Sequence, residues 1–295
     1  MKQNVKAASS PSTSTRLRPV SGRHNARLKE LRLAFRRAEL TASGECAIEG
    51  VKLVEEALRA SHVASVFFSE AARPLAEKLL PQIAARTDTF VLPSELFKSL
   101  VPSESPQGVA ALVRLQPPPA AKILEGAGNG PLVVALGLQD PGNLGTILRS
   151  AEAFGAAGVF LAEGTVSPYN WKALRGSAGS IFRLPCARIS VAELIPLLRQ
   201  HGVRLVATSS HKGTPLPDAD WTPPLAIFVG NEGAGLPREI LHQMDETIVI
   251  PQAAAVESLN AGVAASIVLY EASRMRSNHR GTGAQKECLR GEMTP

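Results

Sequence analysis

Hydrophobic positions in the first half of the chain follow two spacings, which predict helices and short strands in turn. Apolar residues at every third or fourth position predict helices within residues 25–40, 46–60, 74–85 and 93–100. Short runs rich in Val, Phe and Leu predict strands at 63–69, 89–92 and 109–115. Residues 1–20 are rich in Ser, Thr and Pro, have little to bury, and are expected to be disordered.

The second half repeats the order strand, helix, strand. Strands are predicted at 132–138, 158–162, 203–208, 225–229 and 247–250, and the apolar runs at 132–138 and 225–229 are typical of strands buried in a parallel sheet. Helical spacing predicts helices at 143–154, 189–200 and 258–275. The expected fold class is therefore α/β: a mostly parallel sheet with helices on both faces, preceded by a small α/β unit.

A stretch rich in Pro and Gly separates the two halves. Gln116 is followed by three consecutive prolines, which stiffen the chain and cannot join a sheet. We therefore expect a boundary here. The predicted parts are a basic leader, a first domain, a linker, a second domain and a flexible tail, at 1–20, 21–116, 117–130, 131–276 and 277–295.

Basic residues gather near the start of the chain. Residues 1–40 contain ten Lys and Arg against Glu30 and Glu39, an excess larger than the formal net charge of +6 for the whole chain. More Lys and Arg follow the last predicted helix. Basic clusters on a near-neutral body favour a polyanionic partner such as RNA. A solubilising tail and, for residues 1–20, an organelle transit peptide are the alternatives.

The remaining composition argues against several classes of protein. No apolar run approaches the roughly 20 residues that span a bilayer, so no membrane segment is expected. Cys46, Cys186 and Cys288 lie far apart and are odd in number, which predicts a reducing compartment and a cytoplasmic protein without disulfides. The six histidines show no paired spacing, so no metal site is expected.

The first motif follows the strand predicted at 132–138. Asn143 stands where the N-cap of the next helix is expected, after a strand and a turn. The apolar residues of that helix share one face, which should pack on the sheet. Arg149 falls nearly opposite this face. We therefore expect Arg149 to point toward a cleft, a partner subunit or solvent.

The second motif follows the strand predicted at 225–229. That strand runs into Gly230, Gly233 and Gly235, with Glu232 as the one charge in the loop. Glycine permits a ligand to approach the backbone closely. In open parallel sheets ligands bind beyond the carboxyl ends of the strands. The loop is therefore a candidate ligand site, with a simple glycine-rich turn as the alternative.

The third motif links the last predicted strand to the last helix. Ser258 and Asn260 place small polar groups at the start of that helix, next to free backbone N–H donors. Few side chains of residues 261–267 suit contact with water, so the helix is expected to be buried on most sides. Its small residues permit close packing against another helix, including one from a second subunit.

In order and spacing, the three motifs resemble those of the SpoU-type RNA ribose 2′-O-methyltransferases, of the trefoil-knotted methyltransferase superfamily, over residues 131–275. The resemblance implies a knotted C-terminal sheet, S-adenosylmethionine as methyl donor, no metal, and a homodimer to which the last helix contributes. It assigns catalytic roles to Asn143, Arg149, Glu232, Ser258 and Asn260. It assigns donor binding, largely through backbone, to the surroundings of Thr208, Gly230, Ile250 and Leu259.

The first half resembles the substrate-binding domain that often precedes this catalytic domain, through Glu49-Gly50 and residues 106–109. The resemblance implies an RNA-binding domain at 21–116 and the methyltransferase domain at 131–276. The expected reaction is methylation of a ribose 2′-hydroxyl, in ribosomal RNA by preference. A transfer RNA substrate, or a non-catalytic RNA-binding protein of the same fold, is the alternative. The chain lacks GxGxxG and GxxxxGK[ST] motifs, which disfavours a nicotinamide or nucleotide enzyme.

Two features of the motifs bear on the chemistry. Arginine hardly ever loses its proton, so Arg149 is expected to bind phosphate or stabilise a developing alkoxide rather than act as a base. The third motif has Gln252 where the family commonly has Met, and residues 253–255 are all Ala. This departure affects details of donor binding and leaves the reaction class unchanged.

Overall fold

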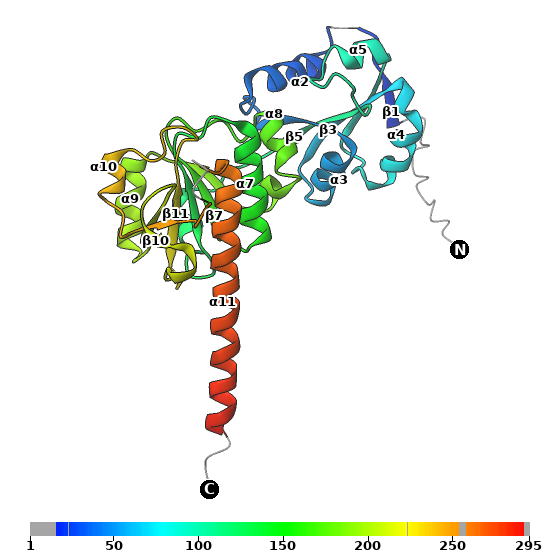
Figure 1. Cartoon of the computed structure of the whole chain (residues 1–295). Helices are drawn as coiled ribbons and strands as arrows, with labels where there is room; N and C mark the ends of the chain where they lie inside the picture. Colours follow the sequence, from blue (N-terminus) through cyan, green and yellow to red (C-terminus); the bar gives the residue numbers. More distant parts are fainter. Residues whose placement is uncertain (1–15, 23, 223, 254–257, 292–295) are drawn as a thin grey trace. The chain divides into compact units, whose positions relative to one another are not determined.

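The computed structural model describes residues 16–22, 24–222, 224–253 and 258–291, with side chains to residue 276. The chain divides into two compact units, Met1–Leu115 and Gln116–Pro295 (Figure 1).

The N-terminal unit is built on a five-stranded mixed sheet in the order β1-β4-β3-β5-β2. The strands are β1 Leu17–Pro19, β2 Glu45–Glu49, β3 Val63–Ser69, β4 Asp88–Leu92 and β5 Val109–Arg114. The helices are α2 Ala26–Arg37, α3 Val51–Arg59, η1 Glu70–Ala72, α4 Arg73–Leu79, η2 Leu80–Gln82 and α5 Ser94–Lys98. Phe67 and Phe68 of β3 are fully buried, and the ring of Phe67 stacks on Phe90 with centroids 5.3 Å apart. These large side chains form the core of the unit.

The end of the predicted disordered leader is ordered, which corrects the boundary at residue 20. β1 pairs in parallel with β4. The guanidinium of Arg16 donates to the carbonyls of Leu80 and Ile83, at 3.1 and 2.6 Å, and Arg18 pairs with Asp88 at 2.8 Å. β1 is too short to show a hydrophobic periodicity in the sequence. It is a strand because these residues, far away in the chain, bind it. Residues 1–15 of the predicted leader lie outside the described residues.

The second unit contains a seven-stranded sheet, all parallel, in the order β10-β12-β9-β11-β6-β7-β8. The strands are β6 Leu132–Ala135, β7 Gly158–Leu161, β8 Cys186–Arg188, β9 Arg204–Ser209, β10 Thr214–Pro215, β11 Leu225–Val229 and β12 Glu246–Val249. The helices are α6 Ala120–Leu124, α7 Pro141–Ala153, α8 Trp171–Gly176, η3 Ser180–Phe182, α9 Val191–Gln200, η4 Leu216–Asp218, α10 Arg238–Leu241 and α11 Ala261–Gly291. The predicted α/β class, with its smaller preceding unit, is confirmed.

Three strands of the large sheet, β6, β7 and β11, are buried on both faces. Leu132, Val134 and Phe228 belong to one core cluster together with residues of α6 and α9. Because successive side chains of a strand point to opposite faces, Val133 and Ala135 face the other side of the sheet. Both are fully buried. Burial on both faces explains why these strands are apolar without alternation.

The chain order across the sheet determines where a ligand site can form. β6, β7 and β8 run outward in sequence order, and β11 is inserted between β6 and β9. The direction of winding therefore changes at this point, and ligands of open parallel sheets bind at such switch points. The carboxyl ends of β6, β11, β9 and β12 lie next to one another at a single edge of the sheet.

The last helix differs from its prediction in two ways. It continues to Gly291, beyond the expected end at Met275 and into the predicted flexible tail, and no proline interrupts the chain before Pro295. It is also less enclosed than expected. Val263 is 46% exposed, and Tyr270 is 54% exposed although its ring contacts that of Phe154 at the end of α7. Within the described residues, no helix is both long and apolar enough to cross a bilayer.

Candidate active site

Glu232 of the second motif binds the first motif directly. Its carboxylate accepts hydrogen bonds from the side-chain amide of Asn143 at 3.0 Å and from the backbone N–H groups of Asp140 and Gln139 at 3.1 and 3.3 Å. Asn143 is buried, with 7% of its surface exposed. The structure therefore joins two of the predicted catalytic residues, which lie 89 positions apart in the sequence.

The N-cap of α7 is Asp140, which corrects the predicted role of Asn143. The carboxylate of Asp140 accepts hydrogen bonds from the backbone N–H groups of Gly142 and Asn143, at 2.5 and 3.2 Å, and Pro141 occupies the first helical position. An acidic cap followed by proline is a favoured helix start. Because Asp140 caps the helix, the side chain of Asn143 lies one turn inside it and is available to Glu232.

The surroundings of Glu232 favour its charged form. Burial opposes ionisation of this carboxyl group, but the hydrogen bonds from Asn143 and from the backbone of the first-motif loop outweigh it. The pKa of Glu232 is therefore lower than its ordinary value. At neutral pH the carboxylate is a fixed acceptor that aligns α7 with the second loop, and it is unsuited to donating a proton.

The second loop is closed by Asn231, a residue that the sequence reasoning missed. Asn231 and Gly235 exchange backbone hydrogen bonds of 3.1 and 3.0 Å. The Oδ1 atom of Asn231 accepts from the N–H groups of Gly233 and Ala234, and its Nδ2 donates to the carbonyl of Gly137 at 2.8 Å. Asn is favoured in turns because its side chain bonds the backbone two residues on, so a signal was present.

Gly230 is required by the same loop. A Cβ atom built on Gly230 would lie 2.4 Å from the carbonyl carbon of Gly235, a backbone atom that cannot move aside cheaply. Gly235 itself has φ +68°, in the left-handed region that favours glycine. These two glycines thus shape the loop that presents Glu232, as the motif suggested.

The third motif provides the N-cap of α11. The Oδ1 atom of Asn260 accepts hydrogen bonds from the N–H groups of Gly262 and Val263, at 3.0 and 3.2 Å. Ser258 is exposed and Leu259 is half-buried, while residues 254–257 lie outside the described residues. Ala254 and Ala255, which belong to the departure from the family's third motif, therefore lie outside the described residues.

Helix α11 is packed along helix α7, so the third motif lies beside the first. The two helices run side by side (Figure 1). The Oγ atoms of Ser150 and Ser266 are 2.7 Å apart, and the rings of Phe154 and Tyr270 meet edge to face with centroids 5.7 Å apart. A Cβ atom on Gly262 would lie 3.1 Å from the Cβ atom of Thr146. The two helix starts are thereby held close to each other.

Arg149 lies on the exposed side of α7, as its place opposite the apolar face predicted. Among the described residues, no hydrogen bond or ion pair engages its guanidinium. Arg149 is six residues from Asn143, about 9 Å along the helix axis. The structure does not bring Arg149 or Ser258 into contact with the Asn143–Glu232 pair, and it leaves Arg149 as an uncompensated cation.

Three of the predicted donor-binding residues lie at the carboxyl ends of neighbouring strands. Thr208 is near the end of β9, Gly230 follows β11, and Ile250 follows β12. The hydroxyl of Thr208 donates to the carbonyl of Phe228 at 3.0 Å, so its side chain is committed to the sheet. A ligand at these positions would therefore contact mainly backbone groups.

Gln252 adds an unsatisfied acceptor to this edge of the sheet. Its Oε1 atom is buried and has no hydrogen-bond partner among the described residues. A buried polar atom without a partner costs free energy, of the order of 1–3 kcal/mol. The arrangement therefore suits a ligand that carries N–H donors.

Gly145 belongs to the first motif, and its role is in helix packing. A Cβ atom on Gly145 would lie 2.7 Å from the carbonyl oxygen of Ala173 and 2.8 Å from the Cα of Gly176. The glycine lets α7 pack against α8, a helix that the sequence reasoning did not predict. Its packing role was hidden because the partner helix is only six residues long.

Within the described residues, no cluster of three or more His, Cys, Asp and Glu has the arrangement of a metal site. Burial raises the pKa of the Cys46 and Cys186 thiols to about 12. Neither thiol is therefore a nucleophile at neutral pH, since the thiolate is the reactive form.

Each of the two units matches a known protein family. Residues 130–270 match the SpoU rRNA Methylase family, and residues 25–111 match the MRM3-like substrate binding domain. The chain is 30% identical over 254 residues to the 23S rRNA (guanosine(2553)-2′-O)-methyltransferase RlmP of Bacillus subtilis. That alignment covers 86% of this chain and 98% of the relative.

Solved structures give the same result. An rRNA methyltransferase from Sinorhizobium meliloti with AdoMet bound superposes with a TM-score of 0.76 and 29% identity, over 88% of this chain and 98% of that one. The SpoU methyltransferase AviRb from Streptomyces viridochromogenes, in complex with AdoMet, gives 0.74 and 30%, over 86% and 98%. The resemblance predicted from the three motifs is thus confirmed, and the chain belongs to the SpoU rRNA methylase family.

Proposed function

We propose that the protein transfers a methyl group from S-adenosylmethionine to a ribose 2′-hydroxyl of RNA, and that its substrate is ribosomal RNA. The observation that carries the proposal is the hydrogen bond from Asn143 to Glu232, which joins two family motifs at the switch point of the sheet. The relative from Bacillus subtilis, matched over almost its whole length, is named as a 23S rRNA 2′-O-methyltransferase. Transfer RNA remains the second candidate substrate.

The residues at the sheet edge suit the methyl donor. Thr208, Gly230, Ile250 and Leu259 provide the backbone around it, and the buried Oε1 atom of Gln252 provides an acceptor for one of its N–H groups. Structures of two relatives contain AdoMet. When bound, this group supplies an activated methyl carbon on a positively charged sulfur. No metal takes part in the proposed reaction.

The side chains of the site then have separate tasks. Glu232 and Asn143 fix the first and second loops relative to each other, and this rigid pair would orient the ribose hydroxyl toward the donor. Arg149 places a permanent positive charge near the RNA, where it binds a phosphate or stabilises negative charge that develops on the ribose oxygen. Ser258 and Asn260 complete the site at the start of α11. The hydroxyl proton leaves to water.

The two units have separate roles in the proposed function. The N-terminal unit, residues 21–116 by prediction, binds the RNA, which agrees with its match to a substrate binding domain. Residues 131–276 carry the methyltransferase site, and 117–130 link the two. The basic leader adds attraction for phosphate through its Lys and Arg.

We also propose a knotted C-terminal unit that forms a homodimer. The insertion of β11 between β6 and β9 is compatible with the knot, since a strand late in the chain lies inside the sheet. The exposed Val263 and Tyr270, seven residues apart on one face of α11, support a second copy packed on that helix. A cytoplasmic location remains a prediction from the spacing of the cysteines.

Two measurements test the function. Titration calorimetry with S-adenosylmethionine should show stoichiometric binding, and absence of binding would refute the methyltransferase assignment. A map of ribose methylation in cells that lack the protein should lose one site in ribosomal RNA. Loss of a transfer RNA site would establish the second candidate, and donor binding with an unchanged map would indicate a non-catalytic RNA-binding protein.

A further inference from the structure

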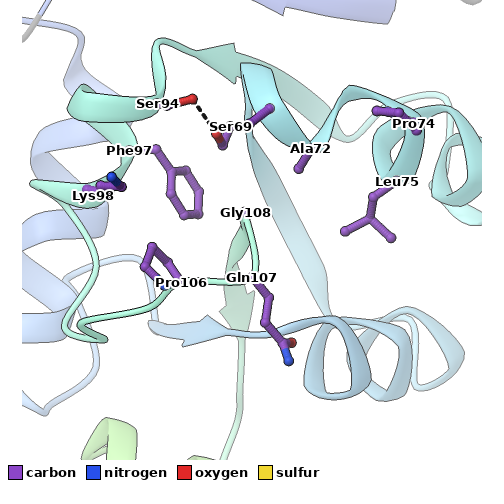
Figure 2. A pocket seen from close by; sticks show the side chains of 11 residues that line it. Ser69, Ala72, Pro74, Leu75, Ser94, Phe97, Lys98, Pro106, Gln107 and Gly108 are labelled. Carbon is purple, nitrogen blue, oxygen red and sulfur yellow. Dashed lines mark hydrogen bonds between the residues drawn. The ribbon is translucent and has the colours of Figure 1, made fainter.

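A pocket of about 510 Å³ opens in the N-terminal unit, outside the three methyltransferase motifs (Figure 2). It forms where β3 and β4 end: Ser69 is the last residue of β3, and Ser94 begins α5 directly after β4. β3 and β4 are parallel, and the carboxyl ends of parallel strands are the usual place for a ligand.

The walls of the pocket are apolar and come from separate elements. Phe97 of α5 and Pro106 lie on one side, and Ala72 and Leu75 lie on the other (Figure 2). Gly108 lies between them with φ +79°, and a Cβ atom there would be 2.5 Å from the Cβ atom of Ala72. The backbone of the Pro-Gln-Gly segment can approach η1 only because residue 108 is glycine. The result is an apolar slot with fixed walls, which suits a flat ring.

Polar groups lie at one end of this slot. The Oγ atoms of Ser69 and Ser94 are 3.0 Å apart, and Ser69 is buried. Two hydroxyls that share one hydrogen bond retain a second O–H donor and several acceptor positions. Gln107 lies away from this end, and its Oε1 accepts a hydrogen bond from the backbone N–H of Val51 at 2.9 Å (Figure 2). Both donors and acceptors are thus available to the edge of a heterocycle.

The rim of the pocket and the unit around it are positively charged. Lys98 is on the rim, and its ammonium lies 3.3 Å from Glu95 in an ion pair whose side chains are 57% and 87% exposed. Such exposed pairs contribute little, so Lys98 can turn to a phosphate at small cost. Residues 1–115 hold 17 of the 32 Lys and Arg but 11 of the 26 Asp and Glu, which places the whole surplus of +6 in this unit.

We propose that the pocket takes one unstacked nucleobase of the RNA substrate, with Lys98 on a neighbouring phosphate. The proposal rests on the proposed function and deepens it, because it says which feature of the RNA the first unit recognises. Proteins read RNA sequence mainly at unpaired nucleotides, whose bases can turn outward into a protein surface. An apolar slot with hydrogen-bonding groups at one end and a cation at its mouth has the parts that such a base and its phosphate require.

Photo-crosslinking tests where the RNA lies. Ala71 is exposed at the rim, and Ala85 is exposed in the same unit without lining the pocket. Full-length protein with p-benzoylphenylalanine at either position is irradiated with deproteinised ribosomal RNA, in the presence of S-adenosylhomocysteine to occupy the donor site. Primer extension should map the crosslinks from position 71 to one or a few unpaired nucleotides that position 85 does not reach. Crosslinks confined to paired segments, or equal patterns from both positions, would overturn the proposal.

Filling the pocket provides an independent measurement. Ala71→Trp should weaken filter binding of the same RNA about tenfold, the contribution of roughly one base, while Ala85→Trp should change it less than twofold. Matching thermal melts of the two variants show that both are folded. Equal binding by both variants would refute the pocket as a base site.

The same preparations separate this proposal from the proposed function. If the wild-type protein binds no S-adenosylmethionine and methylates no RNA, the methyltransferase assignment fails whatever the pocket binds. If donor binding and methylation are intact but Ala71→Trp has the RNA affinity of the Ala85→Trp control, the pocket proposal alone fails.

Discussion

The contact between α7 and α8 can be tested with Gly145→Ala, because helix propensity and packing predict opposite changes in stability for this substitution. Gly145 lies within α7, where replacement of glycine by alanine ordinarily stabilises a helix by about 1 kcal/mol. In this structure, however, a Cβ atom at Gly145 would meet three backbone atoms of α8 at 2.7, 2.8 and 3.0 Å. Backbone atoms cannot rotate aside, so the two helices must move apart.

Overpacking of this kind costs about 1–3 kcal/mol, and contact with three backbone atoms places Gly145→Ala at the upper end of that range. After subtraction of the helix-propensity gain, we expect a loss of about 2 kcal/mol in the free energy of unfolding of the C-terminal unit. With a urea dependence of about 2 kcal/mol per molar, the unfolding midpoint should fall by about 1 M.

Tryptophan fluorescence reports this unit alone, because the chain has two tryptophans, Trp171 and Trp221, and both lie in the C-terminal unit. Urea titration of the full-length protein therefore isolates the transition of interest. Gly128→Ala is the matched control, since a Cβ atom at Gly128 would have no neighbour within 4 Å. A midpoint for Gly145→Ala equal to or above that of the control would refute the assigned packing role.

Three further predictions concern the methyltransferase site. Arg149→Ala should reduce methyl transfer at least about a hundredfold and leave calorimetric donor binding within twofold; equal loss of both would show that the arginine is structural. Because the folded pKa of Glu232 is depressed, its stabilisation is complete above the unfolded pKa of about 4.3 and is lost as the pH falls through the lower folded value. Glu232→Gln should therefore weaken the dependence of the urea midpoint on pH in that acidic range, and an unchanged profile would contradict the assigned hydrogen bonds. Gln252→Met should weaken donor binding severalfold while the ligand-free midpoint stays equal or rises; unchanged affinity would mean that the buried oxygen does not face the donor.

Much of the strand pattern could be predicted from the sequence. β3 and β11 have the predicted bounds, because β3 is rich in Val and Phe and β11 is an unbroken apolar run. The spacing does not predict β2, because residues 46–49 continue into the helical pattern of 46–60. Its first residue, Glu45, is 1% exposed and is paired with Arg27 and Arg114 at 3.0 and 3.1 Å. A buried carboxylate of this kind depends on partners far away in the chain, which periodicity does not register.

The candidate site was predictable in its members and only partly in its geometry. The order of the motifs identified Asn143 and Glu232, but their hydrogen bond depends on β6 and β11 being neighbours in the sheet. Strand order across a sheet is not encoded in local spacing. The sequence does contain the signal for the observed cap, because Asp140 before Pro141 is itself a helix start.

The position of β11 in the middle of the sheet also has a consequence for synthesis of the protein. Five of the other six strands precede it in the chain, so β6–β7–β8 and β9 remain separate pieces with open edges until residues 225–229 have emerged from the ribosome. The N-terminal unit, by contrast, has all its strands by residue 114. Domains generally fold as units during translation, N-terminal first. A nascent chain should therefore become able to hold RNA long before it can modify it.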